Sequence, residues 1–433
     1  MKIQINHIGK MEGKADFVAE ILKGDVKSAK IITTEGARLI EGILVGRHFS
    51  EAPIITSRIC GICPVVHKLS SIKAIENAFK IMPTPQTIRL RQVLELAQII
   101  HSHALHLFFL SLPDFFGLEN DLDFVKKYSQ ETQCAIKVRA WALKIIETIG
   151  GRAVHPINCE VGGFKVLPSK NELKNLQGQY EAVLKNALCL VNLVIKIKYP
   201  KLKRETKFIC LTNKDEYAIY DGDIKISGQG ADKEKVISAK NFTKNVKEIE
   251  EPYRAAKSAT LGGKPFMVGA LARLNNNHQQ LNPLAKGILK GLRWKFPQYN
   301  SFENITAQAV EIVHSIEEIN KILRDLDQNL KSEKNPAEKL KIIGAANPLG
   351  HDVVGIDAIE APRGTLYHHY IIDKNGYIKS CNIITPTVSY LKNLEEDIKE
   401  YLPNIIKLSE KKRSLKIRAL IRAYDPCIAC ATH

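Results

Sequence analysis

The chain has 433 residues, of which 45% are hydrophobic and 25% are charged. This composition excludes a largely disordered protein and allows a large buried core. A total of 63 Lys and Arg against 46 Asp and Glu gives a formal net charge of +17. The basic residues are dispersed through stretches typical of solvated helices, so we expect a positively charged surface and no nucleic-acid partner.

The N-terminal residues contain no apolar signal region, and no stretch reaches the roughly 18 uninterrupted apolar residues of a membrane span. We therefore expect a cytoplasmic protein without a direct membrane span. Nine cysteines form an odd set, which argues against a disulfide framework. Five occur singly and are predicted to be small buried hydrophobic residues: Cys134, Cys159, Cys189, Cys210 and Cys381.

The first part of the chain changes from a strand pattern to a helix pattern. Residues 1–45 contain β-branched residues around a Lys-Gly-Asp turn, which predicts a strand hairpin or meander. A helical pattern begins at Pro64. Thr84 is a predicted N-cap followed by proline, and the helix from there to Pro113 is apolar on nearly every face, which is typical of a buried central helix.

The middle of the chain mixes helices with short strands. We expect a helix over residues 119–148, before a pair of glycines. A capping box of Ser169 and Glu172 predicts another helix that ends near Pro200. Residues 205–230 predict short strands.

Helices are also expected around residues 303–330 and 402–420. Between them, TLYHHYIID and GYIKSCNIITPT flank a Lys-Asn-Gly turn and predict a strand pair. No internal repeat and no low-complexity linker marks a domain boundary. The elements together predict an α+β fold that is mainly helical.

Four cysteines form two CxxC pairs at opposite ends of the chain. Cys60 and Cys63 lie in RICGICPVVH, where proline starts a helix and His67 follows one turn later. Cys427 and Cys430 lie in DPCIACATH at the other end. Thiolates two residues apart can chelate one ion, and soft thiolates select zinc, copper(I), iron or nickel over hard cations.

The residues alone leave the identity of the metal open. One alternative is a structural zinc site made of four cysteines, although zinc knuckles form within a few tens of residues and these pairs are separated by nearly the whole chain. A second alternative is two independent redox dithiols, although neither pair follows a strand and precedes a helix in the thioredoxin manner. The spacing favours metal binding over redox dithiols and leaves the metal undecided.

The two motifs, in this order and at opposite ends, resemble the paired signature of the large subunit of nickel–iron hydrogenases. Interior stretches resemble the soluble, multimeric cytoplasmic class that includes sulfhydrogenases and the methanogen enzymes: EGKADF, SHALHLFFLSLPD, GGRAVHPINCEVGGF, GKPFMVGALARL, EAPRGTLYHHY and IITPT. The resemblance covers essentially the full length. It implies a large-subunit fold with long buried central helices and small peripheral sheets.

The resemblance also implies one interwoven catalytic domain over residues 1–433. Its expected parts are N-terminal strands over 1–45, a helical core over 64–200, a strand and irregular insertion over 201–266, and C-terminal helices and strands that close the metal site over 267–433.

By the same resemblance, Cys60, Cys63, Cys427 and Cys430 would bind nickel through sulfur. Cys63 and Cys430 would also bridge to an iron that keeps carbon monoxide and cyanide ligands. His67 would donate a hydrogen bond toward a bridging sulfur. Without the motif, a histidine on the inner face of a helix is more often a core residue.

Residues near the open metal position also match the family's pattern. Arg363 would hang over that position, with Pro362 packed against the diatomic ligands. Thr387 would hydrogen-bond a cyanide, although alone it could equally cap a helix. Asp425 would pair with or orient the arginine.

Glu12 corresponds to the glutamate that relays protons away from the nickel thiolates. The sequence KMEGK departs from many relatives here, which carry an arginine, a hydrophobic residue and then EGH, so the surroundings of the carboxylate differ. Ser102 stands near where the membrane-linked uptake class tends to carry an aspartate. This second departure supports the cytoplasmic class.

A second ion is implied where the ends of the chain would meet. Glu41 resembles the carboxylate that binds magnesium or a similar divalent cation together with the C-terminal histidine, here His433. A backbone carbonyl from Ile383 and waters would complete the octahedral ligand set that such a cation prefers. Precursors in the family are cut just after this histidine, which implies a maturation endopeptidase and nickel-insertion factors as partners.

The implied reaction is the reversible heterolytic cleavage of hydrogen. Cys427 would take the proton and pass it to Glu12, and Arg363 would assist the cleavage. No further cysteine cluster has iron–sulfur spacing. Electrons would therefore cross to an iron–sulfur small subunit, and then to further flavin or iron–sulfur subunits. The alternatives are a metal-free subunit like the quinone-site subunit of complex I, and a non-catalytic zinc scaffold.

Overall fold

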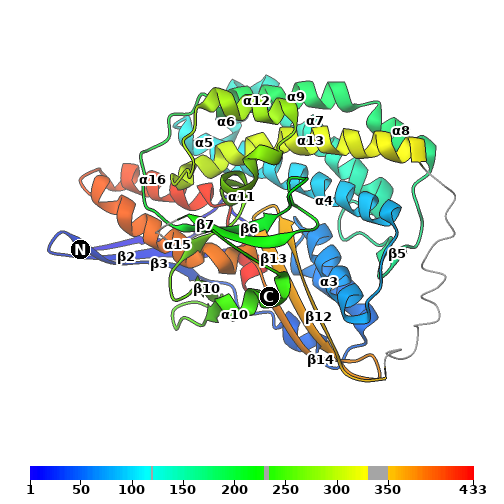
Figure 1. The fold of residues 1–433 in the computed structure, drawn as a ribbon. Coiled ribbons are helices and arrows are strands. Elements are labelled where there is room, and N and C mark those ends of the chain that lie inside the picture. The colour runs from blue at the N-terminus through cyan, green and yellow to red at the C-terminus, as the bar shows by residue number, and fades with distance from the viewer. Residues whose placement is uncertain (119, 229–233, 330–349) are drawn as a thin grey trace.

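The structure is a computed structural model that describes residues 1–118, 120–228, 234–329 and 350–433. Long helices form one layer, at the top of Figure 1, and small sheets lie beneath them and at the edges. This arrangement confirms the α+β, mainly helical fold class that the sequence predicts.

Four long helices form the helical core: α4 (Pro85–Leu105), α7 (Ser129–Gly150), α9 (Tyr180–Val194) and α13 (Asn304–Asn329). α4 begins as predicted, because the Thr84 hydroxyl accepts the Thr87 N–H at 3.1 Å. Among the described ranges, one stretch, Pro85–Phe115, is long and apolar enough to cross a membrane. However, 83% of its apolar 18-residue segment is buried inside the protein. It is therefore explained as the central core helix.

Two of the predicted helices are each divided in the structure. Residues 119–148 do not form one helix: α6 (Asp121–Lys127) and α7 are separated at Tyr128, and residue 119 lies outside the described residues. Tyr128 leaves the helical region with φ −116° and ψ 47°, and its ring packs on Phe124. The capping box at Ser169 is confirmed, but α8 (Lys170–Gln177) ends before α9 begins, and α9 ends at Val194.

Three antiparallel strands, β1 (Lys2–Ile5), β2 (Ala15–Leu22) and β3 (Asp25–Thr33), form the predicted N-terminal meander. Lys23 and Gly24 turn between β2 and β3 with φ of 53° and 90°. The strand pattern does not continue to residue 45, because residues 40–44 form the short helix α1 (Ile40–Leu44).

The strands predicted over residues 205–230 are confirmed as β6 (Lys207–Thr212) and β7 (Asp223–Gly228), which are antiparallel. They form a four-stranded sheet with β8 (Lys235–Ile237) and β11 (Phe266–Met267). The smaller elements of the middle region are β4 (Cys159–Glu160), β5 (Gly163–Phe164), α10 (Phe242–Asn245), β9 (Val246–Ile249), β10 (Ser258–Leu261), α11 (Ala270–Asn277) and α12 (Pro283–Leu292).

The predicted strand pair around the Lys-Asn-Gly turn is confirmed as β13 (Gly364–Ile372) and β14 (Ile378–Ile384). A third strand, β12 (Val353–Ala361), was not predicted. The three-stranded sheet packs on α3 (Pro64–Phe79), the helix that follows the first cysteine pair. This packing fixes the first pair relative to the turn between β12 and β13, which contains Arg363.

The C-terminal helices differ from the predicted helix over 402–420. α15 (Pro386–Tyr401) was missed, and α16 spans Glu410–Ala423. Between them lies a single 3₁₀ turn that contains Pro403, which has no N–H to continue α15. The helix expected around 303–330 is confirmed as α13, apart from residue 330, which is not described.

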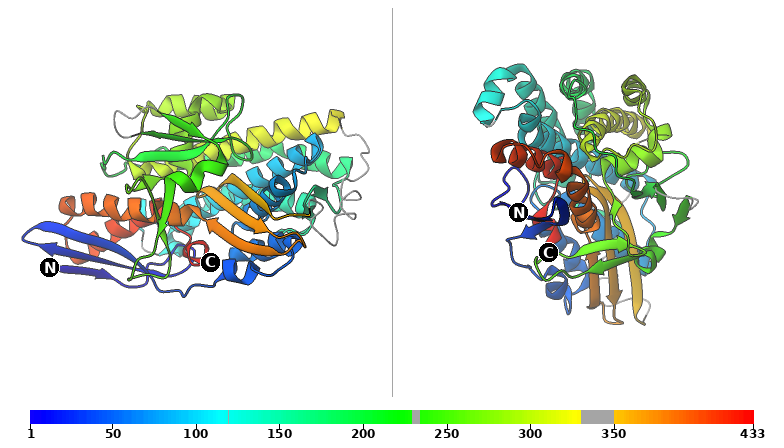
Figure 2. Two further views of the ribbon diagram at one scale, coloured as in Figure 1. Left: turned by 60° about the horizontal axis from the view of Figure 1, so that its bottom comes forward. Right: turned by 90° about the vertical axis from the view of Figure 1, so that its left-hand side faces the viewer.

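The beginning and the end of the chain lie side by side. β3 packs against α15 (Figure 2), and the Ile31 N–H donates to the Glu395 carboxylate at 3.0 Å. The last short helix, α17 (Ile428–Ala431), lies beside the segment that follows β1, because the Ile428 N–H donates to the Glu12 carbonyl at 2.7 Å. Both cysteine pairs are thereby brought to the same region.

Candidate metal centre

The first cysteine pair lies in a tight loop that two helices hold. Cys60 is extended, and Cys63 precedes α3, whose first residue is proline. Gln98 from α4 braces this loop: its side-chain N–H donates to the Ile62 carbonyl at 2.6 Å, and its oxygen accepts the Val65 N–H at 3.2 Å. The backbone that carries the two sulfurs therefore has few alternative conformations.

The second cysteine pair lies at the short helix α17, where Cys427 is the N-cap and Cys430 is within the helix. The Cys427 sulfur accepts the Cys430 N–H at 3.3 Å, which closes the turn. The Cys427 N–H donates to the Thr387 hydroxyl at 3.1 Å, so the first turn of α15 supports the pair. Thr387 does not cap α15, because Thr385 occupies the N-cap position.

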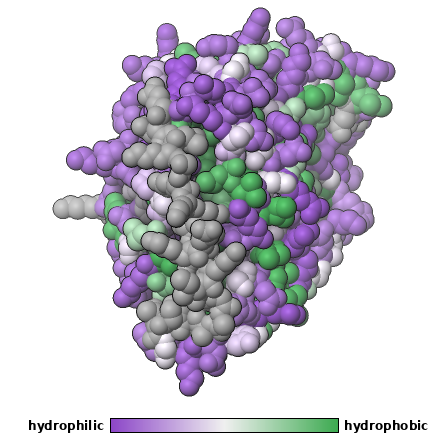
Figure 3. All heavy atoms as spheres, turned by 90° about the vertical axis from the view of Figure 1, so that its right-hand side faces the viewer, coloured by the Kyte–Doolittle hydropathy of each residue, from purple (hydrophilic) through white to green (hydrophobic). Residues whose placement is uncertain are grey.

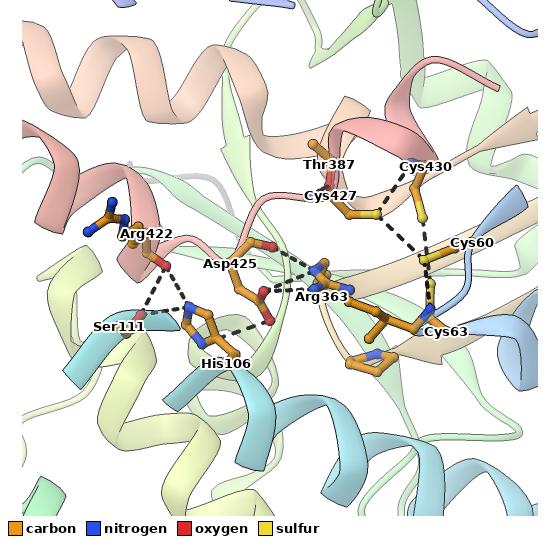
Figure 4. A network of polar contacts seen from close by, with 12 residues as sticks. Cys60, Cys63, His106, Ser111, Arg363, Thr387, Arg422, Asp425, Cys427 and Cys430 are labelled. Atoms are coloured by element: carbon orange, nitrogen blue, oxygen red, sulfur yellow. Dashed lines mark hydrogen bonds and ion pairs between the residues drawn. The ribbon is translucent and has the colours of Figure 1, made fainter. Parts of the chain in front are cut away.

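The four sulfurs converge. The Sγ atoms of Cys60 and Cys427 are 3.8 Å apart, and those of Cys63 and Cys430 are 3.5 Å apart (Figure 4). The Sγ atoms of Cys60, Cys63 and Cys430 all lie within 4.8 Å of one another. All four side chains are buried. We call these four residues the cysteine cluster.

The pKa values of three thiols in the cysteine cluster are shifted in different directions. Contacts with the other cysteine side chains, Cys427 first, hold the pKa of Cys60 well below its usual range. Contact with Cys427 is also the largest cause that raises the pKa of Cys63 and Cys430. A soft metal ion can bind four such buried sulfurs, and it displaces the protons that they hold.

A buried arginine faces the cysteine cluster from the β12–β13 turn. The Arg363 guanidinium donates to Asp425, from Nη2 to Oδ1 at 2.9 Å and from Nε to the backbone oxygen at 2.7 Å. Its Nη1 is buried with no hydrogen-bond partner among the described residues. Pro362 precedes it in the turn, and the Pro362 carbonyl accepts from Arg273 at 3.0 Å.

His67 lies on α3 beside the cysteine cluster. Its Nε2 is 3.6 Å from the Cys430 sulfur, and its Nδ1 is buried without a partner among the described residues. Burial lowers the pKa of His67 to about 3, so the ring is neutral at physiological pH. The buried donor of Arg363 without a partner and the four sulfurs fit a metal pair that carries additional ligands.

Glu12 lies at the edge of the cysteine cluster. Its backbone forms a bridge with Cys427, and its side chain is half-buried. Burial first, and then the charge of Cys60, raise the pKa of Glu12 above its ordinary value. A carboxyl group in this position can hold a proton at a higher pH than an exposed glutamate can.

A second constellation joins Glu41, Ile383 and His433. The Glu41 Oε1 accepts the Ile383 N–H at 2.7 Å and lies 3.8 Å from His433 Nε2, which is 2.9 Å from the Ile383 carbonyl oxygen. Burial acts to raise the pKa of Glu41, but the contact with His433 and the Ile383 N–H lower it overall. The Lys257 ammonium lies 3.5 Å from the other Glu41 oxygen.

A family model described as nickel-dependent hydrogenase matches residues 38–134 and 210–433, which include the whole cysteine cluster. The chain belongs to this hydrogenase family. Over its full length it is 33% identical to the alpha chain of sulfhydrogenase 1 of Pyrococcus furiosus, 98% of which is covered. It is 28% identical over its full length to a chain of the F420-non-reducing hydrogenase of Methanothermobacter marburgensis, 95% of which is covered.

Solved hydrogenase structures share the fold. The chain matches an NAD+-reducing [NiFe]-hydrogenase in the H2-reduced state with a TM-score of 0.85 and 25% identity, with 100% of this chain and 99% of that chain covered. A [NiFeSe]-hydrogenase of Desulfomicrobium baculatum matches over the full length of both chains with a TM-score of 0.76 and 20% identity, which shows the fold alone. These matches confirm the expected hydrogenase large-subunit fold.

Three residues that support the hydrogenase site were not found from the sequence: Gln98, Arg273 and Gln308. Arg273 holds the β12–β13 turn, because it donates to the carbonyls of Ala361 and Pro362 while it pairs with Glu311 and Glu360. Arg273 lies in GKPFMVGALARL, but no role was predicted for it, and Gln98 and Gln308 lie in none of the quoted stretches. The partners of all three lie tens to hundreds of residues away.

The remaining predictions around the hydrogenase site had mixed outcomes. Ser102 is buried, and its hydroxyl has no hydrogen-bond partner among the described residues. Of the five single cysteines, three are buried as predicted, but Cys189 and Cys381 are only partly buried. Cys381 lies on β14, where its side chain is partly exposed. The spacing of cysteines along the sequence does not reveal this exposure.

Proposed function

We infer that this member of the hydrogenase family catalyses the heterolytic cleavage of hydrogen at a nickel–iron centre held by the cysteine cluster. The observation that carries this function is the convergence of Cys60 and Cys427, 3.8 Å apart, from opposite ends of the chain. Family membership and the donor set of four buried sulfurs support the same reading. A zinc scaffold and a metal-free quinone-site subunit have no support from the relatives.

All four residues of the cysteine cluster would hold nickel, and Cys63 and Cys430 would also bridge to an iron that carries carbon monoxide and cyanide. When bound, the metal pair supplies a Lewis-acidic, redox-active site for hydrogen. The 3.5 Å separation of the Cys63 and Cys430 sulfurs supports their sharing of metals. His67 would support the Cys430 sulfur. Thr387 would hydrogen-bond a cyanide, and Pro362 would pack against the diatomic ligands.

The protein groups around the centre would handle the proton. The Cys427 thiolate accepts it at Sγ, and Glu12, whose backbone is bridged to Cys427, receives it next. Arg363 supplies a desolvated positive charge, and Asp425 fixes its orientation through Oδ1. The Arg363 Nη1, buried and without a partner among the described residues, remains available to a ligand of the centre.

Glu41, His433 and the Ile383 carbonyl would bind magnesium or a similar divalent cation. His433 Nε2 lies 3.8 Å from Glu41 Oε1 and 2.9 Å from the Ile383 carbonyl oxygen, and carboxylate, imidazole and carbonyl groups with added waters suit such an ion. Glu41 also meets the ammonium of Lys257 at 3.5 Å, so the ion and this cation would share one carboxylate. The ion would fasten the last residue to the rest of the chain.

An iron–sulfur small subunit would dock over the loop of the first cysteine pair, where Gly61 is exposed. Exposed apolar side chains occur in two segments, before this loop and around His155: Ile43, Val45 and Ile54, and Val154, Ile157 and Val166. The two segments that carry them meet, because His155 bonds the Ser57 carbonyl at 2.8 Å. The face of the molecule that carries β5 shows apolar patches among hydrophilic side chains (Figure 3).

Both of the relatives named above are single chains of hydrogenases that contain several different chains, which supports a multi-subunit enzyme. Further flavin or iron–sulfur subunits would carry the electrons onward in the cytoplasm. A maturation endopeptidase and nickel-insertion factors would act on the precursor. We propose that residues 1–433 function as one interwoven catalytic domain, since both ends of the chain contribute to the same site.

Elemental analysis and hydrogen-dependent reduction of a viologen dye test this function on the purified complex. We expect nickel and iron in about equal amounts, and dye reduction only under hydrogen. Infrared bands from metal-bound carbon monoxide and cyanide would identify the iron ligands. Zinc alone would support the scaffold, and a protein without metal would support the quinone-site relative.

A further inference from the structure

A chain of buried polar contacts continues from Asp425 away from the cysteine cluster, and Figure 4 shows His106, Ser111 and Arg422 on that side of Asp425. His106 Nδ1 lies 3.9 Å from Asp425 Oδ2. The Asp425 Oδ2 accepts the side-chain N–H of Gln308 at 3.1 Å. The Gln308 oxygen lies 2.5 Å from His106 Nδ1, and His106 Nε2 lies 2.8 Å from the Ser111 hydroxyl and 2.6 Å from the Arg422 carbonyl. None of the five residues in this series of contacts is more than 5% exposed.

The direction of each bond follows from the chemistry of its partners. Asp425 Oδ1 already accepts from Arg363, and Oδ2 can only accept, so the amide nitrogen of Gln308 must face it. The Gln308 oxygen must then face His106 Nδ1, which must donate to it. The Arg422 carbonyl can only accept, so His106 Nε2 must donate as well. Each group in the chain thus fixes the orientation of the next.

The helices that carry the chain explain why these groups meet. Gln308 lies on the buried helix α13. His106 and Ser111 lie five residues apart in a π-helical segment, His106–Ser111, that links α4 to α5 (Leu112–Phe115). Residues five apart face different directions in an α-helix, whose period is about 3.6 residues, whereas the wider π-turn brings them over one another. The rigid core therefore anchors the far end of the chain.

We propose that Gln308 and His106 are positioning residues for Arg363. They act through Asp425: Gln308 satisfies the carboxylate oxygen that Arg363 leaves free, and His106 holds the Gln308 amide in the required orientation. Without them Asp425 can rotate and the guanidinium can shift relative to the cysteine cluster. The inference rests on the proposed function, since it assigns a role in the same reaction.

Gln308→Met tests the proposal because it keeps the length of the side chain and removes both hydrogen bonds. We expect kcat for hydrogen-dependent viologen reduction to fall about tenfold, with nickel, iron and the thermal unfolding midpoint unchanged. Asn320→Leu is the matched control, since Asn320 is a buried amide on the same helix and its Oδ1 has no partner among the described residues. Its kcat should stay within about twofold of the unmodified enzyme.

A second pair of variants tests the histidine. Asn can place an N–H near the position of the His106 Nδ1, whereas leucine cannot. We expect His106→Leu to reproduce the loss of Gln308→Met, and His106→Asn to recover most of the activity. Equal losses in both variants would overturn the assigned donor role.

A double-mutant cycle separates positioning from a general structural defect. If Gln308 acts through Arg363, Gln308→Met should lower kcat less than about twofold in an Arg363→Lys background. A loss of the same size in both backgrounds, or loss of nickel from Gln308→Met, would overturn the proposal. Unchanged kcat in Gln308→Met would contradict this inference alone, whereas an unmodified complex without nickel would contradict the proposed function itself.

Discussion

Cys60 differs from Cys63 and Cys430 in the direction in which its pKa is shifted. Its Sγ accepts the Ile62 N–H at 3.3 Å and faces Cys427 at 3.8 Å. Contacts with the side chains of Cys427, Cys430 and Cys63, in that order, hold the pKa of Cys60 low, while the pKa of Cys63 and of Cys430 is raised. Nickel binding therefore displaces protons from thiols of the cluster, Cys63 and Cys430 among them, so metal affinity should increase as the pH rises.

Glu12→Gln tests the proton relay at the residue scale. Glutamine keeps the size of the side chain but cannot carry a proton between groups, so hydrogen-dependent dye reduction should fall by about 100-fold or more. Nickel and iron content should not change, because the backbone bridge between Glu12 and Cys427 does not need the carboxyl group.

Glu20→Gln is the control for this substitution, since Glu20 is exposed on β2. It should leave the rate unchanged. A Glu12→Gln enzyme that retains more than half of the activity would exclude Glu12 from the relay.

At this scale the sequence predicts residues that lie in short motifs better than residues whose role depends on packing. Cys60, Cys427, Arg363 and Glu12 lie in short motifs that identify them. Gln98 belongs to no such motif, because its role depends on how α4 packs against the loop before α3. Packing between helices is a tertiary property that no local spacing encodes.

The contact between α4 and the loop before α3 gives a prediction at the scale of elements. Gln98→Met leaves the Ile62 carbonyl and the Val65 N–H without their partner, and each buried group left unpaired costs about 1–3 kcal/mol. We expect the loop to loosen and nickel content per chain to fall by half or more in elemental analysis. Gln92→Met on the same helix, which loses only a bond to Arg89, should retain its metal.

The crossing of α3 and β12 gives a second prediction at this scale. A Cβ atom at Gly355 would overlap the Ala74 carbonyl and lie 2.9 Å from Ala78 Cβ, so Gly355→Ala must push α3 from the sheet. We expect it to destabilise the protein by about 1–3 kcal/mol or more, measured as a lower thermal unfolding midpoint. Gly287→Ala in α12 meets no atom within 4 Å and should be neutral or stabilising. Equal midpoints in both variants would refute this explanation of the crossing.

The elements were predicted where a local signal was strong. Thr84 with Pro85 and the Ser169 capping box identified helix starts correctly. α15 was missed because Thr385 and Pro386, also a helix start, follow a β-rich run that reads as a continuing strand. A Thr-Pro pair can therefore start a helix even directly after a strand pattern.

The whole molecule is closed by contacts between its ends. The Arg38 N–H donates to the Thr432 carbonyl at 2.8 Å, and His433 reaches Ile383 at 2.9 Å. The motifs at the two ends predicted this closure. The three-stranded sheet on α3, which aligns Arg363 with both pairs, was predicted only in part, because β12 carries no turn signal of its own.

A cation at Glu41 and His433 would stabilise this closure. A ligand present at about 100 times its dissociation constant adds about 2.7 kcal/mol to the stability. Removal of divalent ions with a chelator should therefore lower the thermal unfolding midpoint of the unmodified protein, and magnesium should restore it. The His433→Ala variant should begin with the lower midpoint and respond to neither treatment. A variant that still responds to magnesium would place the ion elsewhere.

The central claim is that sulfurs from both ends of the chain bind one nickel–iron pair. Anomalous X-ray diffraction from crystals of the purified complex, recorded at the nickel and iron absorption edges, tests it directly. We predict a nickel peak among Cys60, Cys63, Cys427 and Cys430, with an iron peak beside Cys63 and Cys430. A zinc peak alone, or no peak among these sulfurs, would contradict the claim.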